Sequence, residues 1–207
     1  MNRLRYELEI MYKGSFLYSR KLLWLWAKSS NDHKIKSELV KQIREIYGTQ
    51  ILVETGTYLG KMIHDQLNNF KQIHSIEISD YYYRIAISRF RKYPHVHLYF
   101  GDSSLALEGV LNKINSPVLF WLDGHYSGGK TGIGKTVTPL LDELNIIFNK
   151  ISSPVVLIDD ARYFLDENNH DYPNLNEINN VISNPVRNMN LEVRGDIICL
   201  LPVEPQK

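Results

Sequence analysis

The sequence predicts an α/β protein built on a doubly wound sheet of about seven strands that ends in an antiparallel hairpin. Short apolar runs recur from residue 51 onward, and segments with helical spacing lie between them. The stretch "LEVRGDIICLLPV" then places two apolar runs on either side of Gly195-Asp196, which is typical of a hairpin. The alternation of strand and helix predicts parallel strands, because each connection must cross over the sheet.

Five strands are expected before the hairpin, and the first of them is a short buried run. They are expected at residues 51–54, 73–77, 96–100, 117–123 and 154–159. The run "PVLFWLD" at 117–123 is continuously apolar up to its final acid, as strands covered on both faces are.

Helices are expected between these strands, and capping residues mark several of their ends. Gly48 ends the helix "IKSELVKQIREIYG", and Asp80 caps the helix after the second strand. Ser103 or Ser104 caps the next helix. Pro139 opens the helix after the fourth strand, because a proline there lacks only an N–H that would be unpaired anyway. A last helix is expected near "LNEINNVIS".

Composition narrows the class of protein. The net charge is +1 and 23% of residues are charged, so no field of one sign argues for a nucleic-acid partner. Cys199 is the single cysteine, which excludes an internal disulfide and is typical of a reducing compartment. The longest apolar run near the N-terminus, "LLWLWA", is too short to span a bilayer. We therefore expect a cytoplasmic protein.

Two parts are expected: a helical N-terminal extension at residues 1–47 and a single α/β domain at residues 48–207. Within the extension, residues 16–28 mix tryptophans with basic residues, as helices at a membrane surface do. Packing of the same aromatic side chains on the domain is the alternative. A lid, a contact within a homo-oligomer and a peripheral attachment to the inner face of the membrane all remain open for this part.

The segment "GKTGIGKT" matches the P-loop pattern of nucleotide hydrolases. In a P-loop, the glycines leave a strand directly and the lysine and threonine begin a helix. Here "GHYSG" separates the strand ending at Asp123 from the glycines, and the next helix opens only at Pro139. The spacing favours a glycine loop that closes over a substrate, with Lys130 and Lys135 available to a substrate phosphate.

Acidic residues end all five expected strands or follow within two residues. They are Glu54, Glu77, Asp102, Asp123 and the pair Asp159-Asp160. In open α/β sheets ligands bind at the carboxyl ends of the strands. Like charges gathered on one rim cost stability unless a ligand or cation uses them, so this rim is the expected site.

The first strand continues as "VETGTYLG", and Glu77 follows about 20 residues later, which suggests a nucleoside held by its ribose hydroxyls. With these motifs, residues 49–203 resemble the class I S-adenosylmethionine-dependent methyltransferases, which have a Rossmann-like fold. The resemblance implies that Glu77 binds the ribose and that Asp102 and Ser103 border the adenine, with Asp123 also next to the cofactor. The residues implied around its methionine part are Glu54, Thr55, Gly56, Thr57, Tyr58 and Gly60.

The fourth and fifth strand ends resemble a narrower branch, the cation-dependent catechol-type and macrolide-sugar O-methyltransferases. That resemblance implies a Mg²⁺ site at Asp123, Asp159 and Asp160. Hard oxygen ligands are those that Mg²⁺ requires, and the cation would lower the pKa of an acceptor hydroxyl. Capping of the next segment by Asp159 or Asp160 is the alternative.

His125 is the expected general base, because its ordinary pKa lies near neutral pH and it follows Asp123 closely. Tyr126 and Lys130 are alternatives, since the catechol branch uses a lysine in this neighbourhood. The combination "DGHYSGG…DDAR" also resembles bacterial methyltransferase-like proteins met near surface-glycan genes. That likeness favours a small-molecule or sugar acceptor with a free hydroxyl.

The expected function is therefore S-adenosylmethionine-dependent O-methylation, assisted by Mg²⁺. Two other functions stay open. A P-loop hydrolase would bind ATP or GTP through "GKTGIGKT". A non-enzymatic adaptor with a methyltransferase-like fold would bind a membrane or a partner through residues 1–47 without transferring a methyl group.

Overall fold

The computed structural model describes residues 31–115, 117–126, 132, 134, 136–166, 168–183 and 188–203. Contacts divide the chain into two units, residues 1–36 and 37–207. Of the first unit only residues 31–36 are described, and they begin helix α2 (Asn31–Tyr47). The segment 16–28 and most of the expected extension lie outside the described residues. No described helix is both long and apolar enough to cross a membrane.

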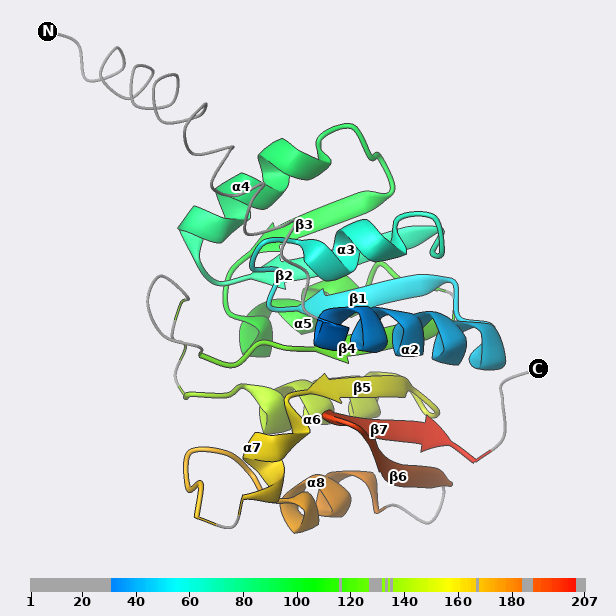
Figure 1. The fold of residues 1–207 in the computed structure, drawn as a ribbon, viewed down its shortest axis with the longest axis vertical. Helices are drawn as coiled ribbons and strands as arrows, with labels where there is room; N and C mark the ends of the chain where they lie inside the picture. Colours follow the sequence, from blue (N-terminus) through cyan, green and yellow to red (C-terminus); the bar gives the residue numbers. More distant parts are fainter. Residues whose placement is uncertain are drawn as a thin grey trace, which may run out of the picture. The chain divides into compact units, whose positions relative to one another are not determined.

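One seven-stranded sheet forms the centre of the second unit (Figure 1), in the order β3-β2-β1-β4-β5-β7-β6. Its strands are β1 (Ile51–Thr55), β2 (Gln72–Glu77), β3 (Val96–Phe100), β4 (Val118–Leu122), β5 (Val155–Asp159), β6 (Met189–Arg194) and β7 (Ile197–Pro202). Strands β1 to β5 are parallel, and β7 runs antiparallel to both of its neighbours. The predicted doubly wound sheet with a terminal hairpin is confirmed. Its strand order reverses between β1 and β4, the position where ligands bind in such sheets.

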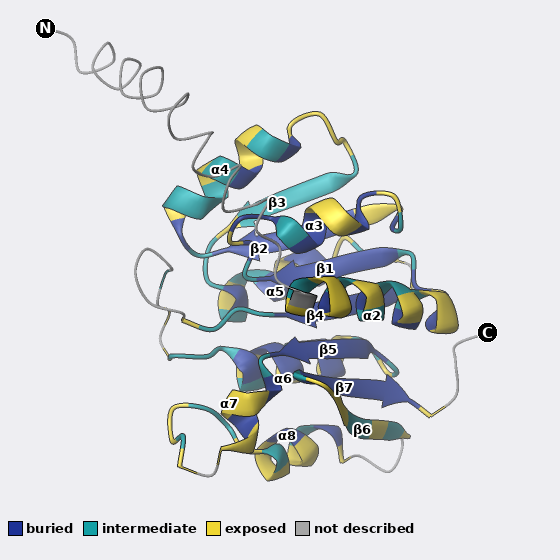
Figure 2. Ribbon diagram, viewed as in Figure 1, coloured by how far each residue is buried: buried dark blue, intermediate teal, exposed yellow. Residues whose placement is uncertain are grey.

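Helices cover both faces of this sheet and bury two apolar layers against it (Figure 2). One layer packs residues of α2, α3 (Lys61–Gln66) and α4 (Asp80–Phe90) on the strands. The other packs α5 (Ser103–Leu111), α6 (Leu140–Lys150), α7 (Ala161–Leu165) and α8 (Leu175–Ile182). Leu52 faces the first layer and Val53 the second, because successive side chains of a strand point to opposite faces.

The helix ends next to the strand termini set the rim of the site. Gly48 ends α2 with φ 63°, as expected. The expected serine cap of α5 is wrong, because the carboxylate of Asp102 takes that role and accepts the N–H of Ser104 at 2.9 Å. An ionised carboxylate is the stronger acceptor for the unpaired N–H groups of a first helical turn. Asp102 is thereby fixed at the edge where β3 ends.

Candidate active site

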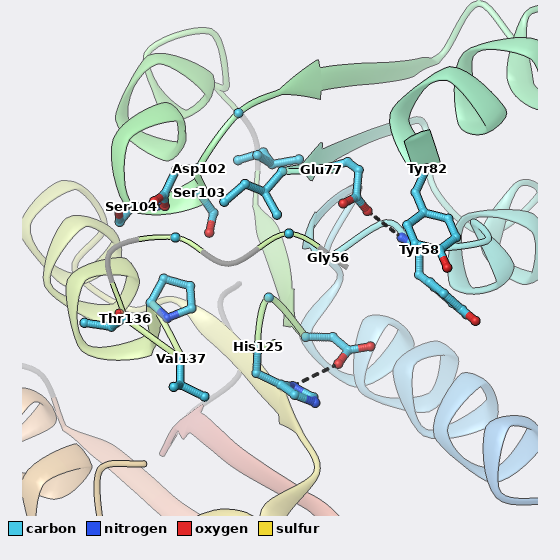
Figure 3. A pocket seen from close by; sticks show the side chains of 18 of the residues that line it. Gly56, Tyr58, Glu77, Tyr82, Asp102, Ser103, Ser104, His125, Thr136 and Val137 are labelled. Carbon is cyan, nitrogen blue, oxygen red and sulfur yellow. Dashed lines mark hydrogen bonds and ion pairs between the residues drawn. The ribbon is translucent and has the colours of Figure 1, made fainter. Parts of the chain in front are cut away.

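A pocket of about 340 Å³ lies at the carboxyl ends of the parallel strands, where the strand order reverses (Figure 3). Its walls include residues that follow β1, β2, β3, β4 and β5. Six of the predicted cofactor residues line it: Gly56, Tyr58, Glu77, Asp102, Ser103 and Asp123. His125, Asp159 and Asp160 line the same pocket. The fold thus brings most of the acidic rim to one cavity.

Gly56 lies where the loops after β1 and β4 meet. A Cβ atom at this position would stand 2.1 Å from the carbonyl oxygen of Asp123. The backbone has φ 82°, a conformation that residues with side chains rarely adopt. Only glycine fits this contact. Because glycine has no side chain, the backbone at this position is exposed to the pocket.

Glu77 is buried and points into the pocket (Figure 3). Its carboxylate accepts the backbone N–H of Tyr58 at 2.7 Å on one oxygen and that of Ser79 at 2.8 Å on the other. Burial raises the pKa of this carboxyl, and the backbone donors act against the rise. The backbone N–H groups of Ile78 and Thr57 also act on this carboxylate, which presents its acceptor oxygens to the pocket.

Four predicted cofactor residues lie behind the pocket wall instead of lining it: Glu54, Thr55, Thr57 and Gly60. The Glu54 carboxylate accepts the hydroxyl of Ser75, which also bonds the hydroxyl of Thr57 at 2.6 Å. Burial raises the pKa of Glu54 to about 8. Glu54 therefore supports the loop after β1 from beneath in this structure.

His125 lies between two carboxylates at the other end of the pocket. Its Nδ1 is 3.4 Å from Oδ1 of Asp123, and its Nε2 is 3.1 Å from Oδ2 of Asp160. The imidazole is only 8% exposed. Asp160 has φ 58°, an uncommon conformation for a residue that is not glycine and one that concentrates at functional sites.

The two aspartates after β5 play different parts. Asp159 is buried, and its Oδ1 accepts the backbone N–H of Asp160 at 2.7 Å. The Oδ1 atom of Asp160 pairs with the Arg162 guanidinium at 2.9 Å, while its Oδ2 faces His125. Of the pair, Asp160 is the residue that joins the cluster with Asp123 and His125.

Aromatic rings surround His125 on the side of α7 and the segment after it. Its ring centroid is 5.8 Å from that of Tyr163 and 6.0 Å from that of Tyr172. The two tyrosine rings are themselves 5.1 Å apart. Burial, the neighbouring Tyr163 and nearby aspartates raise the pKa of Tyr172 to about 12, so its phenol stays protonated near neutral pH.

Described parts of the glycine loop form the opposite wall. Gly132 lies against Ile78, and Gly134 lies so close to Asp102 that a Cβ atom would stand 2.6 Å from its Oδ2. Thr136 precedes the start of α6 and donates its hydroxyl to a carbonyl two residues later. The threonine of the P-loop pattern is therefore not in the first turn of a helix. Lys130 and Lys135 lie outside the described residues.

Sequence reasoning missed Tyr82 in the pocket and three residues that pack around its Asp160 and His125. Tyr82 lines it, and its ring centroid lies 4.6 Å from that of Tyr58 (Figure 3). The run "YYY" shortly after β2 was the available signal. Arg162, which anchors Asp160, directly follows the aspartate pair and its alanine. Tyr163 and Tyr172 carry no motif and come together only through the fold.

No protein-family model and no curated protein matches the chain. Solved structures do match its fold. The O-methyltransferase TomG from Streptomyces achromogenes, in complex with S-adenosylmethionine, is 12% identical with a TM-score of 0.60, over 98% of this chain and 99% of that one.

Two further structures contain S-adenosylhomocysteine. The Bacillus cereus O-methyltransferase is 14% identical, with a TM-score of 0.59 over 88% of this chain and 89% of that one. The Podospora anserina methyltransferase PaMTH1 is 11% identical, with a TM-score of 0.59 over 98% and 96%. The chain thus has the Rossmann-like methyltransferase fold that its sequence resembles.

Proposed function

We propose that the protein is an S-adenosylmethionine-dependent O-methyltransferase. The observation that carries the proposal is the buried Glu77 carboxylate, which faces the pocket beside the glycine contact at Gly56. The Glu77 carboxylate would accept hydrogen bonds from the ribose hydroxyls, and Gly56 lets the backbone approach the rest of the cofactor. Asp102 and Ser103 border the adenine end in this assignment. The bound cofactor supplies an electrophilic methyl group on sulfur.

The acceptor is assigned to the end of the pocket that holds Asp123, His125 and Asp160. Tyr163 and Tyr172 pack edge-on against His125 at this end without lining the pocket, so they position the imidazole beside the acceptor. The methyl acceptor is a hydroxyl, whose proton has to be removed during transfer. His125 is the general base that the sequence predicts at this end, and its Nε2 lies 3.1 Å from Oδ2 of Asp160.

A divalent cation fits the same end, because carboxylate oxygens converge there. Mg²⁺ with Asp123, Asp159 and Asp160 as ligands is the form that the sequence predicts. A cation at this position lowers the pKa of a neighbouring hydroxyl. The general base and the ligand are competing roles for His125, because a ring nitrogen bound to a cation cannot accept a proton.

In the most direct test, the protein is incubated with S-adenosylmethionine and with panels of nucleotide sugars, glycan fragments and catechols as methyl acceptors. Release of S-adenosylhomocysteine together with a methylated product is the expected result. Glu108→Gln is the control variant, because this exposed carboxylate on α5 lies outside the pocket lining. Cofactor binding without turnover of any acceptor would favour the adaptor, and ATP hydrolysis would favour the P-loop enzyme.

A further inference from the structure

The geometry points to a metal site whose ligands are Asp123, His125 and Asp160, and which prefers a first-row transition ion such as Mn²⁺ to Mg²⁺. This inference rests on the proposed function only for its position beside the acceptor. It changes both the ligand set and the metal that the sequence predicts, because a histidine takes the place of Asp159.

The three side chains already converge. One ligand atom from each of Asp123, His125 and Asp160 lies within 4.8 Å of the others. They come from the loop after β4 and from the residue after β5, two neighbouring strands whose ends are held in parallel register. Asp123 is a third exposed, whereas the side chains of His125 and Asp160 are 8% and 14% exposed. The cluster is therefore enclosed on one side and open to the pocket on the other.

Asp159 is buried next to this cluster and lines the same pocket. Its Oδ1 accepts the backbone N–H of Asp160 at 2.7 Å. That bond ties Asp159 to a residue with a left-handed backbone, whose carboxylate lies 3.1 Å from His125. A buried acid that fixes a ligand is a common partner in metal sites.

Asp160 and His125, the two less exposed ligands, are each held in place by neighbouring side chains. The outer oxygen of Asp160 pairs with Arg162, which also pairs with Asp196 and lies over the ring of Tyr163 at 4.7 Å. The rings of Tyr163 and Tyr172 stand edge-on to the imidazole of His125. Orientation of ligands before the metal binds reduces the cost of ordering them on binding.

The chemical types of the three ligand atoms determine which metal ion the site prefers. Two carboxylates and one imidazole form a mixed oxygen and nitrogen set, whereas Mg²⁺ and Ca²⁺ favour oxygen ligands throughout. Imidazole is a good ligand for first-row transition ions, whose affinity for such sites exceeds that of Mg²⁺. His125 then serves as a ligand, and the role of general base passes to another group or to water.

Titration of the metal alone tests this without any methyl transfer. Electron paramagnetic resonance measures free Mn²⁺ as the apo protein is added, and Mg²⁺ is then used as competitor. Wild type is expected to bind a single Mn²⁺, and His125→Ala to weaken binding by about tenfold or more. Asp159→Asn keeps an oxygen that accepts the Asp160 N–H, so it is expected to weaken Mn²⁺ binding less than His125→Ala does.

The His125→Asp variant tests the metal preference in the opposite direction. It turns the set into three carboxylates, so Mg²⁺ is expected to compete better against Mn²⁺ than in wild type. Unchanged Mn²⁺ affinity in His125→Ala, or no Mn²⁺ binding by wild type, overturns the inference. Thermal unfolding of each variant shows whether it is folded. Cofactor calorimetry reports separately on the proposed function, so the two can fail independently.

Discussion

At the scale of single residues, Gly56 makes the most demanding contact of the pocket. Its backbone has φ 82°, and a side chain there would collide with the carbonyl of Asp123. The letters "ETGTYLG" indicate a glycine turn, but they do not show that the glycine holds the loops after β1 and β4 together. That role depends on β4, which lies more than sixty residues away and pairs with β1 only in the folded sheet.

Gly56→Ala is expected to lower stability by about 1–3 kcal/mol from backbone strain alone, and to abolish cofactor binding by moving the Asp123 loop. Gly109→Ala is the control, because that glycine lies inside α5 with open space around its Cβ position. Alanine favours a helix interior by about 1 kcal/mol over glycine, so this variant should be equally or more stable. Thermal unfolding and calorimetry check both, and a Gly56→Ala protein that binds the cofactor normally would refute the assigned contact.

Glu54 predicts a pH dependence of stability. Burial raises its pKa in the folded state from an ordinary value of 4.5 to about 8. The folded state therefore binds the proton more tightly, so this contribution to stability is present below pH 4.5 and is lost as the pH rises through about 8. The Glu54→Gln variant has no carboxyl to ionise and therefore does not lose this stability. The difference between its melting temperature and that of wild type should grow in its favour from pH 5 to about 8.5.

The exposed acid Glu108 provides the comparison for this pH series, since its side chain is 61% exposed. Glu108→Gln should follow the wild-type profile at every pH. Parallel profiles for wild type and Glu54→Gln would show that the Glu54 carboxyl ionises as freely in the folded chain as in the unfolded one.

At the scale of elements, the hairpin positions the site. The carbonyl of Asp196, in the turn between β6 and β7, accepts the N–H of Ala161 at 2.9 Å. The Asp196 carboxylate accepts the N–H of Arg162 at 2.9 Å and pairs with its guanidinium. The turn thereby fixes the start of α7, which follows Asp160 directly.

Asp196→Ala is accordingly expected to weaken Mn²⁺ binding by about tenfold while the sheet stays folded. Glu192→Ala, a change on the same hairpin away from α7, is the control and should leave the affinity unchanged. Mn²⁺ titration and thermal unfolding measure the two effects separately. Equal affinities in the two variants would mean that the hairpin does not brace the ligand.

The elements themselves were largely predictable. Strands β1, β4, β5 and β7 are short apolar runs buried on both faces, which makes them conspicuous, whereas β3 is half-buried and β6 mixes polar with apolar residues. Helix α7 was not predicted, because five residues are too few to show helical periodicity. The cap of α5 was assigned to a serine although Asp102 provides it, since sequence alone does not say which of several capping residues faces the N–H groups.

The candidate site was predictable only in part for the same reason. The acids lie at strand ends, and strand ends meet in a parallel sheet, so Glu77, Asp102 and Asp123 could be placed on one rim from sequence. Tyr163 and Tyr172 depend on the path of the chain after β5, which no local pattern shows. The different contacts of Asp159 and Asp160 likewise appear only in the folded chain, because the sequence shows two adjacent aspartates and nothing to tell them apart.

At the scale of the whole molecule, "GKTGIGKT" and the sheet support different functions. The P-loop pattern concerns eight residues, whereas the fold, the strand reversal and the buried Glu77 involve most of the chain. Gly132 and Gly134 stand against Ile78 and Asp102, on the wall assigned to the cofactor. The position of these two glycines favours a pocket that binds a nucleoside over a loop that wraps phosphate groups.

Isothermal titration calorimetry of S-adenosylmethionine, with ATP as the competing ligand, tests the central claim most directly. Wild type should bind S-adenosylmethionine and not ATP. Glu77→Ala should lose more than about 30-fold in affinity, because charge-assisted hydrogen bonds to the ribose disappear. Glu108→Gln, whose thermal unfolding serves as the folding reference, should bind as wild type. Binding of ATP without S-adenosylmethionine, or unchanged affinity in folded Glu77→Ala, would contradict the assignment of this pocket.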